Sequence, residues 1–98
     1  MRKKKFGRAC QVVRAFVHEW DPYGWLATGC PEDEFDSEIA SLAGQLPRIR
    51  SRKDAALAIS RVFSAAFGYD KRFAPDACRD LGARLFDALE AEGLIESD

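Results

Sequence analysis

The sequence predicts an all-α fold, a compact four-helix bundle made by a single domain over residues 1–98. In four separate stretches the apolar residues recur at steps of three and four, which is the spacing of one helix face. No stretch alternates with a period of two for long enough to form a strand. A chain of 98 residues with 47% apolar and 32% charged residues is typical of one folded globule. Connections of about five to ten residues between the stretches favour an up-down arrangement.

The first helix is expected over residues 6–20. One apolar stripe runs along it, made by Phe6, Cys10, Val13, Phe16, Val17 and Trp20. The helix ends at the Asp21-Pro22 pair, because Pro22 fixes its own φ and favours extended geometry at Asp21. Gly24 follows two residues later and tolerates the positive φ that a turn can need.

The second helix is expected over residues 31–46, with Pro31 at its first position, where a missing N–H costs nothing. Glu32, Asp33 and Glu34 then fall in the first turn, where the helix dipole favours negative charge. The inward stripe is Phe35, Ile39, Leu42 and Leu46.

The third helix is expected over residues 52–67, after a capping box in which Ser51 is the N-cap and Asp54 replaces the usual Glu. Its stripe is Ala55, Ile59, Val62, Phe63, Ala66 and Phe67. Gly68 suits a left-handed C-terminal stop.

The fourth helix is expected over residues 75–92, opened by Pro75 and ended by Gly93. Its inward residues are Cys78, Leu81, Leu85, Ala88 and Leu89. Gly82 lies in the middle, where Gly costs about 1 kcal/mol relative to Ala. Its presence therefore predicts a close helix crossing.

Cysteine usage and hydropathy point to a soluble protein of a reducing cytoplasm. Cys10, Cys30 and Cys78 are odd in number and lack C-x-x-C spacing, which argues against a disulfide framework and against zinc. The basic residues at the start are not followed by an uninterrupted apolar stretch, so no export signal is expected. No apolar run approaches the roughly 20 residues of a membrane-spanning helix.

Charge is strongly segregated along the chain. Residues 2–14 carry six positive charges and no acid, residues 48–53 carry four positive charges, and residues 87–98 carry five negative ones. The basic start has no recognised nucleic-acid motif, so we expect a solvated tail and no nucleic-acid partner.

The residues do not predict catalysis, a cofactor or a metal. His18 and Cys10 are eight residues apart on one helix, about 12 Å along its axis, which excludes a direct nucleophile pair. His18 is expected to be a structural histidine with satisfied hydrogen bonds, and a contact with Cys30 or Cys78 across the fold stays open. The chain contains no phosphate-binding loop and no paired metal-ligand spacing, so we expect no enzyme.

The segment from Glu19 to Glu38 is the least ordinary part of the sequence, with seven carboxylates and no Lys or Arg. Cation-binding loops alternate their ligands around a glycine, and this pattern does not. Asp36 has two interpretations, as an acceptor for the Trp20–Gly24 turn or as a partner-binding residue. The predicted partner-binding residues, aromatic anchors and carboxylates together, are Tyr23, Trp25, Asp33, Glu34, Asp36 and Glu38.

W-D-P-Y-G followed by G-C-P-E-D-E-F-D-S-E resembles a group of small helical bacterial proteins carrying W-D-P-x-G and P-x-D-E-Y-D. The matching residues are Trp20, Asp21, Pro22, Gly24, Pro31, Asp33, Glu34, Phe35 and Asp36. Phe35 stands where the group usually has Tyr. Many members are domains of unknown function, and some are similar to immunity proteins paired with polymorphic or contact-dependent growth-inhibition toxins.

This resemblance implies an immunity protein that binds a cognate toxin domain, which we expect to be a nuclease. A nuclease cleft is usually basic, so an acidic surface would speed association and favour the right partner. The alternative is a standalone helical interaction domain whose acidic loop is structural. The sequence predicts no oligomeric state.

Overall fold

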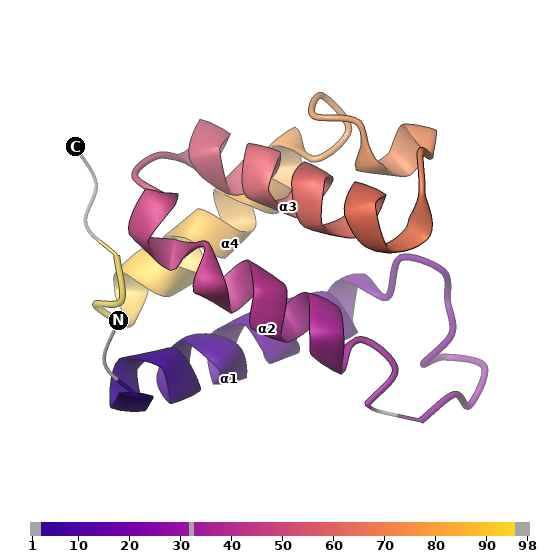
Figure 1. The fold of residues 1–98 in the computed structure, drawn as a ribbon, viewed down its shortest axis with the longest axis horizontal. Helices are drawn as coiled ribbons and strands as arrows, with labels where there is room; N and C mark the ends of the chain where they lie inside the picture. The colour runs from indigo at the N-terminus through magenta and orange to yellow at the C-terminus, as the bar shows by residue number, and fades with distance from the viewer. Residues whose placement is uncertain (1–2, 32, 96–98) are drawn as a thin grey trace.

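A computed structural model describes residues 3–31 and 33–95, and within them the chain is all-α, with no strand. Its elements are α1 (Lys3–Trp20), α2 (Asp36–Gly44), the 3-10 helix η1 (Leu46–Arg48), α3 (Arg52–Phe67), the 3-10 helix η2 (Lys71–Phe73) and α4 (Arg79–Ala91). Figure 1 shows that successive α-helices run in opposite directions. The predicted fold class, an all-α arrangement of four helices, is confirmed.

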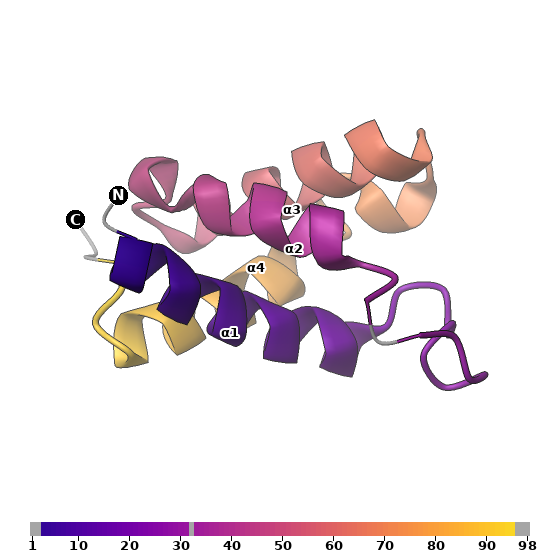
Figure 2. The same ribbon diagram turned by 60° about the horizontal axis from the view of Figure 1, so that its bottom comes forward.

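The four α-helices surround one core. α1 contacts α2 and α4, and α3 likewise contacts α2 and α4, so α1 and α3 occupy opposite corners of the bundle. Figure 2 shows α3 on one side of the molecule and α1 on the other. Every α-helix contributes fully buried side chains, among them Val13, Ile39, Ile59 and Leu85. The stripes read from the sequence therefore do face the core.

α1 begins at Lys3, three residues before the predicted start, and ends at Trp20 as predicted. Lysine is a good helix former, and nothing between Lys3 and Phe6 interrupts the helix. Basic residues at a helix N-terminus oppose the helix dipole. The helix accommodates these basic residues because the start of α1 lies beside the end of α4 (Figure 2).

The predicted start of the second helix at Pro31 is wrong, because α2 begins only at Asp36. Residues 33–35 form turns instead, in which the Glu34 N–H donates to the Pro31 carbonyl at 3.2 Å and the Asp36 N–H to the Asp33 carbonyl at 3.1 Å. Burial of Phe35, which is 0% exposed, fixes this geometry just before the helix. The predicted end is also too late, since α2 stops at Gly44 and Leu46–Arg48 forms η1 around Pro47.

α3 has the bounds that the sequence predicts. The Ser51 hydroxyl accepts a hydrogen bond from the Asp54 N–H at 3.1 Å, as expected of an N-cap. The Asp54 carboxylate accepts from the Arg50 N–H at 3.0 Å, one residue earlier than in a standard capping box. Gly68 ends the helix with φ +84°.

One predicted core residue of α3, Ala66, is exposed. The last turn of this helix projects towards the loops, where the aromatic ring of Phe67 makes the contacts instead.

The predicted start of the fourth helix at residue 75 is also early, because α4 begins at Arg79. The preceding turn shares the Cys78 N–H between the carbonyls of Ala74, at 3.1 Å, and Pro75, at 3.2 Å. The crossing predicted at Gly82 is confirmed: a Cβ there would lie 2.5 Å from the backbone nitrogen of Ala56 on α3.

Candidate functional site

The loop after α1 is organised by the carboxylate of Asp21. Its Oδ1 accepts a hydrogen bond from the Leu26 N–H at 3.1 Å, and its Oδ2 accepts from the Ala27 N–H at 3.0 Å. The expectation of extended geometry at Asp21 is wrong, because its φ is +44°. Asp tolerates this left-handed region better than most residues, and its two hydrogen bonds hold it there.

Arg72 fastens the same loop to the turn after α3. Its guanidinium donates to the Pro22 carbonyl at 2.6 Å and lies 4.5 Å from the centre of the Tyr23 ring. The Asp70 carboxylate orients the guanidinium through a contact of 3.2 Å. A single arginine thus joins segments that are 50 residues apart in the sequence.

The predicted anchors Tyr23 and Trp25 are half-buried and belong to an aromatic cluster. The two rings stack on each other with centroids 4.9 Å apart, and Trp25 stacks on the buried Phe35 at 5.6 Å. Trp20 packs edge-on against Phe63 at 4.9 Å. These contacts give the aromatic residues a packing role, and only the exposed part of each ring is open to a partner.

The four predicted carboxylates lie together where the loop enters α2, but they differ in their surroundings. Asp33 and Glu34 are exposed in the turn, Asp36 is exposed in the first turn of the helix, and Glu38 is half-buried there. The acidic residues in the first turn of α2, at the positive end of its dipole, are thus Asp36 and Glu38 and not the predicted residues 32–34.

Asp36 does not accept hydrogen bonds from the Trp20–Gly24 turn, contrary to one of its two interpretations. Its Oδ1 instead pairs with Arg14 of α1 at 2.8 Å, and both side chains are about half exposed, at 49% and 44%. The carboxylate that accepts hydrogen bonds from backbone N–H groups of this loop is that of Asp21 and not that of Asp36.

The pKa of the Glu38 carboxyl is raised above its usual value. Burial raises the pKa of its carboxyl, a hydrogen bond from its own backbone N–H opposes the rise, and the negative charge of Glu34 adds to it. Within residues 3–31 and 33–95, Asp33, Glu34 and Glu38 make no ion pair.

Among the described residues, the histidine and the cysteines form no group of three or more, and the three cysteines are free. Cys78 is buried, and its Sγ donates to the Arg72 carbonyl at 3.7 Å. Burial raises the pKa of the thiols of Cys78 and Cys10, which disfavours the reactive thiolate. His18 is not the fully satisfied residue that was expected, because its buried Nε2 has no hydrogen-bond partner among the described residues.

The described ranges, 3–31 and 33–95, contain no group of three or more His, Cys, Asp or Glu side chains placed to hold a metal ion. They also contain no helix with the length and apolar character needed to cross a bilayer.

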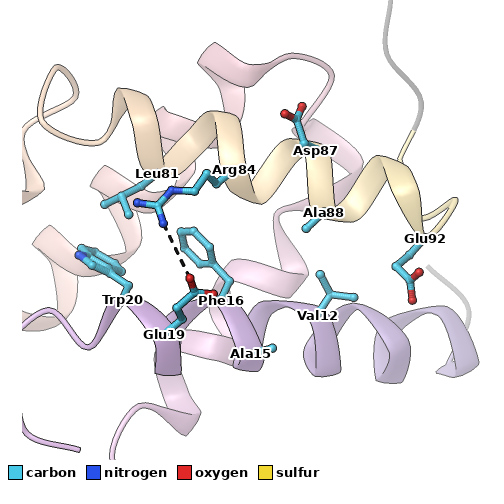
Figure 3. A pocket seen from close by; sticks show the side chains of 10 residues that line it. All are labelled: Val12, Ala15, Phe16, Glu19, Trp20, Leu81, Arg84, Asp87, Ala88 and Glu92. Atoms are coloured by element: carbon cyan, nitrogen blue, oxygen red, sulfur yellow. Dashed lines mark ion pairs between the residues drawn. The ribbon is translucent and has the colours of Figure 1, made fainter. Parts of the chain in front are cut away.

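A second feature, which the sequence did not reveal, is an open groove of about 590 Å³ between α1 and α4. Figure 3 shows the two helices as its walls, with Glu19 and Arg84 facing each other across it. Leu81 and Ala88 were expected to point inward and are only half-buried, because they line this groove. The sequence did contain a clue, since Val12 widens the apolar face of α1 beyond a single stripe.

The chain matches no family model, no curated protein and no solved structure.

Most residues of the W-D-P-Y-G and acidic motif have structural contacts. Trp20 and Phe35 pack in the aromatic cluster, Asp21 organises the loop, and Gly24 adopts φ +69°. Among the described carboxylates of the motif, Asp33 and Glu34 are the two that are exposed and have no hydrogen-bond or ion-pair partner. They are therefore the motif residues best placed to contact another molecule.

Proposed function

We propose that this chain is an immunity protein that binds and neutralises a cognate bacterial toxin domain, without catalysis, in the cytoplasm. The observation that carries the proposal is the uncompensated acidic surface formed by Asp33, Glu34 and Glu38. Carboxylates that repel one another gain most when a partner brings positive charge, because the partner relieves the repulsion as it binds. A nuclease is the toxin class that best meets this need, since its substrate is a polyanion.

The aromatic cluster supports the proposal by holding the acidic surface in place. Phe35 is buried between the turn and α2, and Trp25 stacks on it, so the backbone that carries Asp33 and Glu34 is anchored where it enters α2. A rigid surface loses little entropy on binding, which favours affinity. Asp36 contributes less in this arrangement, because Arg14 already neutralises it.

A second function is favoured by a specific observation. Most motif residues make contacts within the fold, including the Asp21 hydrogen bonds and the Phe35 packing. These contacts support the alternative, a standalone helical interaction domain in which the acidic loop is structural.

The decisive experiment starts with the reading frame next to the one that encodes this chain. A neighbouring secreted protein with a variable C-terminal toxin domain provides the partner, and co-expression of this chain should protect cells from that domain. Glu34→Lys with Glu38→Lys should slow association with the purified toxin domain by about tenfold at low salt, because exposed charges act mainly through steering.

The matched control reverses two exposed carboxylates on α4, in the double variant Asp80→Lys with Glu90→Lys. Both double variants change the net charge equally. Urea unfolding of each variant separates loss of binding from loss of folding. If the control slows association as much as the test variant, bulk charge and not this surface governs binding. If neither variant has an effect, the acidic surface is not the interface.

A further inference from the structure

The loop after α1 has one long-range tether. Residues 22–31 make hydrogen bonds with one another and with neighbours no more than six residues away. Within the described ranges, 3–31 and 33–95, the exception is the bond from the Arg72 guanidinium to the Pro22 carbonyl, at 2.6 Å. Figure 1 places this loop and η2, which contains Arg72, at the same end of the bundle. The position of the loop relative to the helices therefore depends on Arg72 and on aromatic packing.

A series of contacts links Arg72 to the acidic turn. The guanidinium lies 4.5 Å from the centre of the Tyr23 ring, which stacks on Trp25 with centroids 4.9 Å apart. Trp25 stacks in turn on Phe35 at 5.6 Å, with the two rings 11° from parallel. Contacts of both kinds, cation over ring and ring on ring, are attractive. Phe35 is fully buried and directly follows Glu34. We call these four groups, Arg72, Tyr23, Trp25 and Phe35, the Arg72 column.

Arg72 is itself held in place. One oxygen of the Asp70 carboxylate accepts hydrogen bonds from the Arg72 backbone N–H at 2.9 Å and from its Nε at 3.2 Å. The next residue, Phe73, is fully buried, and its carbonyl accepts a hydrogen bond from the buried Ser60 hydroxyl at 2.5 Å. A side chain fixed in this way loses little further freedom when it contacts the loop. Arg72 is therefore placed to hold the loop against the rest of the fold.

The charge of Arg72 does not suit direct contact with a basic partner. It adds a positive charge at the end of the molecule where Asp33 and Glu34 are the unpaired groups, and like charges across an interface oppose binding. A positioning role and electrostatics alone thus predict opposite effects on affinity when Arg72 loses its charge.

We propose that Arg72 is a positioning residue for the acidic surface: through the Arg72 column it fixes the turn that carries Asp33 and Glu34 in the geometry that binds the partner. This inference rests on the proposed function. A surface that is already in place binds more tightly, because fewer conformations are lost on association. Arg72 lies outside the segment from Glu19 to Glu38, in which the sequence placed the binding residues.

The first test uses the free protein. Arg72→Ala should quicken amide exchange at Glu34 and Asp36, whose N–H groups make the hydrogen bonds of the turn. The expected change is about two- to tenfold, the effect of losing one hydrogen bond. The matched control Lys71→Ala removes the same charge from the adjacent exposed position and should leave both amides unchanged. Unchanged exchange in Arg72→Ala, or an equal change in both variants, would mean that the column does not hold the turn.

The second test measures affinity for the toxin domain encoded by the neighbouring reading frame. Arg72→Ala should weaken binding by about two- to tenfold, whereas Lys71→Ala should leave it unchanged or strengthen it. Arg72→Lys keeps the cation but not the planar donor, so its affinity should fall between those of the wild type and Arg72→Ala. Tighter binding of Arg72→Ala would overturn the proposal, because charge alone would then explain the effect.

A double-mutant cycle tests whether Arg72 acts through the carboxylates. In the background of Glu34→Lys with Glu38→Lys, Arg72→Ala should cause little further loss of affinity, because the surface that it positions no longer binds. An undiminished loss would mean that Arg72 contacts the toxin itself, which contradicts a positioning role. Urea unfolding verifies that each variant is folded. If Arg72→Ala is not, Arg72→Met replaces it, because it keeps an apolar stem over Tyr23 and removes the donor and the charge.

Failure of this inference and failure of the proposed function give different results. If the wild-type protein neither binds the toxin domain nor protects against it, the proposed function is wrong and the role of Arg72 in binding is wrong with it. If the wild type binds and Arg72→Ala binds equally well, only the role of Arg72 is wrong.

Discussion

At the scale of single residues, Asp21 shows how one side chain can determine a loop. It combines a left-handed backbone, at φ +44°, with a carboxylate that accepts two backbone N–H groups. Each feature alone is compatible with several residue types, but the combination suits Asp and, less well, Asn. This explains in physical terms why an acid precedes Pro22 in the motif.

Asp21→Ala should destabilise the protein by about 1 to 3 kcal/mol, because two N–H groups lose their acceptor and a β-carbon remains in a disfavoured conformation. Asp21→Asn should cost clearly less, since the amide keeps one acceptor oxygen and Asn tolerates positive φ. Urea unfolding of the three proteins measures the order. Equal losses for Ala and Asn would mean that the carboxylate does not organise the loop.

At the scale of elements, the sequence predicted a close helix crossing at Gly82, and the structure shows that it joins α4 to α3. A glycine in mid-helix is unfavourable by itself, so its position in α4 required a tertiary explanation. The structure provides it, because the backbone of Ala56 occupies the place where a side chain at position 82 would go.

Gly82→Ala should destabilise the protein by about 1 to 3 kcal/mol through overpacking, although alanine is the better helix former by about 1 kcal/mol. The clash dominates because its nearest atoms, 2.5 and 2.7 Å away, are backbone atoms that cannot move alone. Gly7→Ala in α1 is the matched control, since nothing lies within 4 Å of a Cβ there. Urea unfolding should give opposite signs for the two variants, and a stabilised Gly82→Ala would contradict the crossing.

At the scale of the whole molecule, the basic start of α1 and the acidic end of α4 lie beside each other. The basic start of α1 and the acidic end of α4 each oppose the dipole of their own helix. The antiparallel packing brings these ends side by side (Figure 1), and the Arg8 hydrogen bond to the Glu92 carbonyl joins the first helix to the last.

Arg8→Ala should therefore cost about 0.5 to 1.5 kcal/mol, the usual net value of a hydrogen bond. Arg61→Ala on the exposed face of α3 is the control, because Arg61 makes no hydrogen bond or ion pair to the described residues. We expect it to change stability by less than about 0.5 kcal/mol. Hydrogen exchange should quicken at the end of α4 only in Arg8→Ala, and equal effects in both variants would contradict a link between the ends.

The candidate sites could be predicted from the sequence only in part. The acidic segment was visible as composition, but the sequence could not tell that Arg14 neutralises Asp36, since the pair spans 22 residues and two elements. The groove could not be predicted from the one clue that Val12 gives, because it depends on how far apart α1 and α4 pack. An apolar residue such as Leu81 has the same sequence pattern whether it is covered or lines an opening.

The sequence by itself determined the fold class, the bounds of α3, the end of α1 and the crossing at Gly82. These follow from local rules: apolar periodicity, the Ser51 cap and glycine conformation act within a few residues. Only the tertiary structure decided the starts of α2 and α4, the partners of Asp21 and Asp36, and the groove. The Asp36 pair with Arg14 and the groove depend on contacts between separate elements. The start of α2 depends on burial of Phe35 against Trp25, which outweighs the weak preference of Pro31 for a helix start. The Asp21 hydrogen bonds stay within one loop, but they need a left-handed backbone that local preference does not favour.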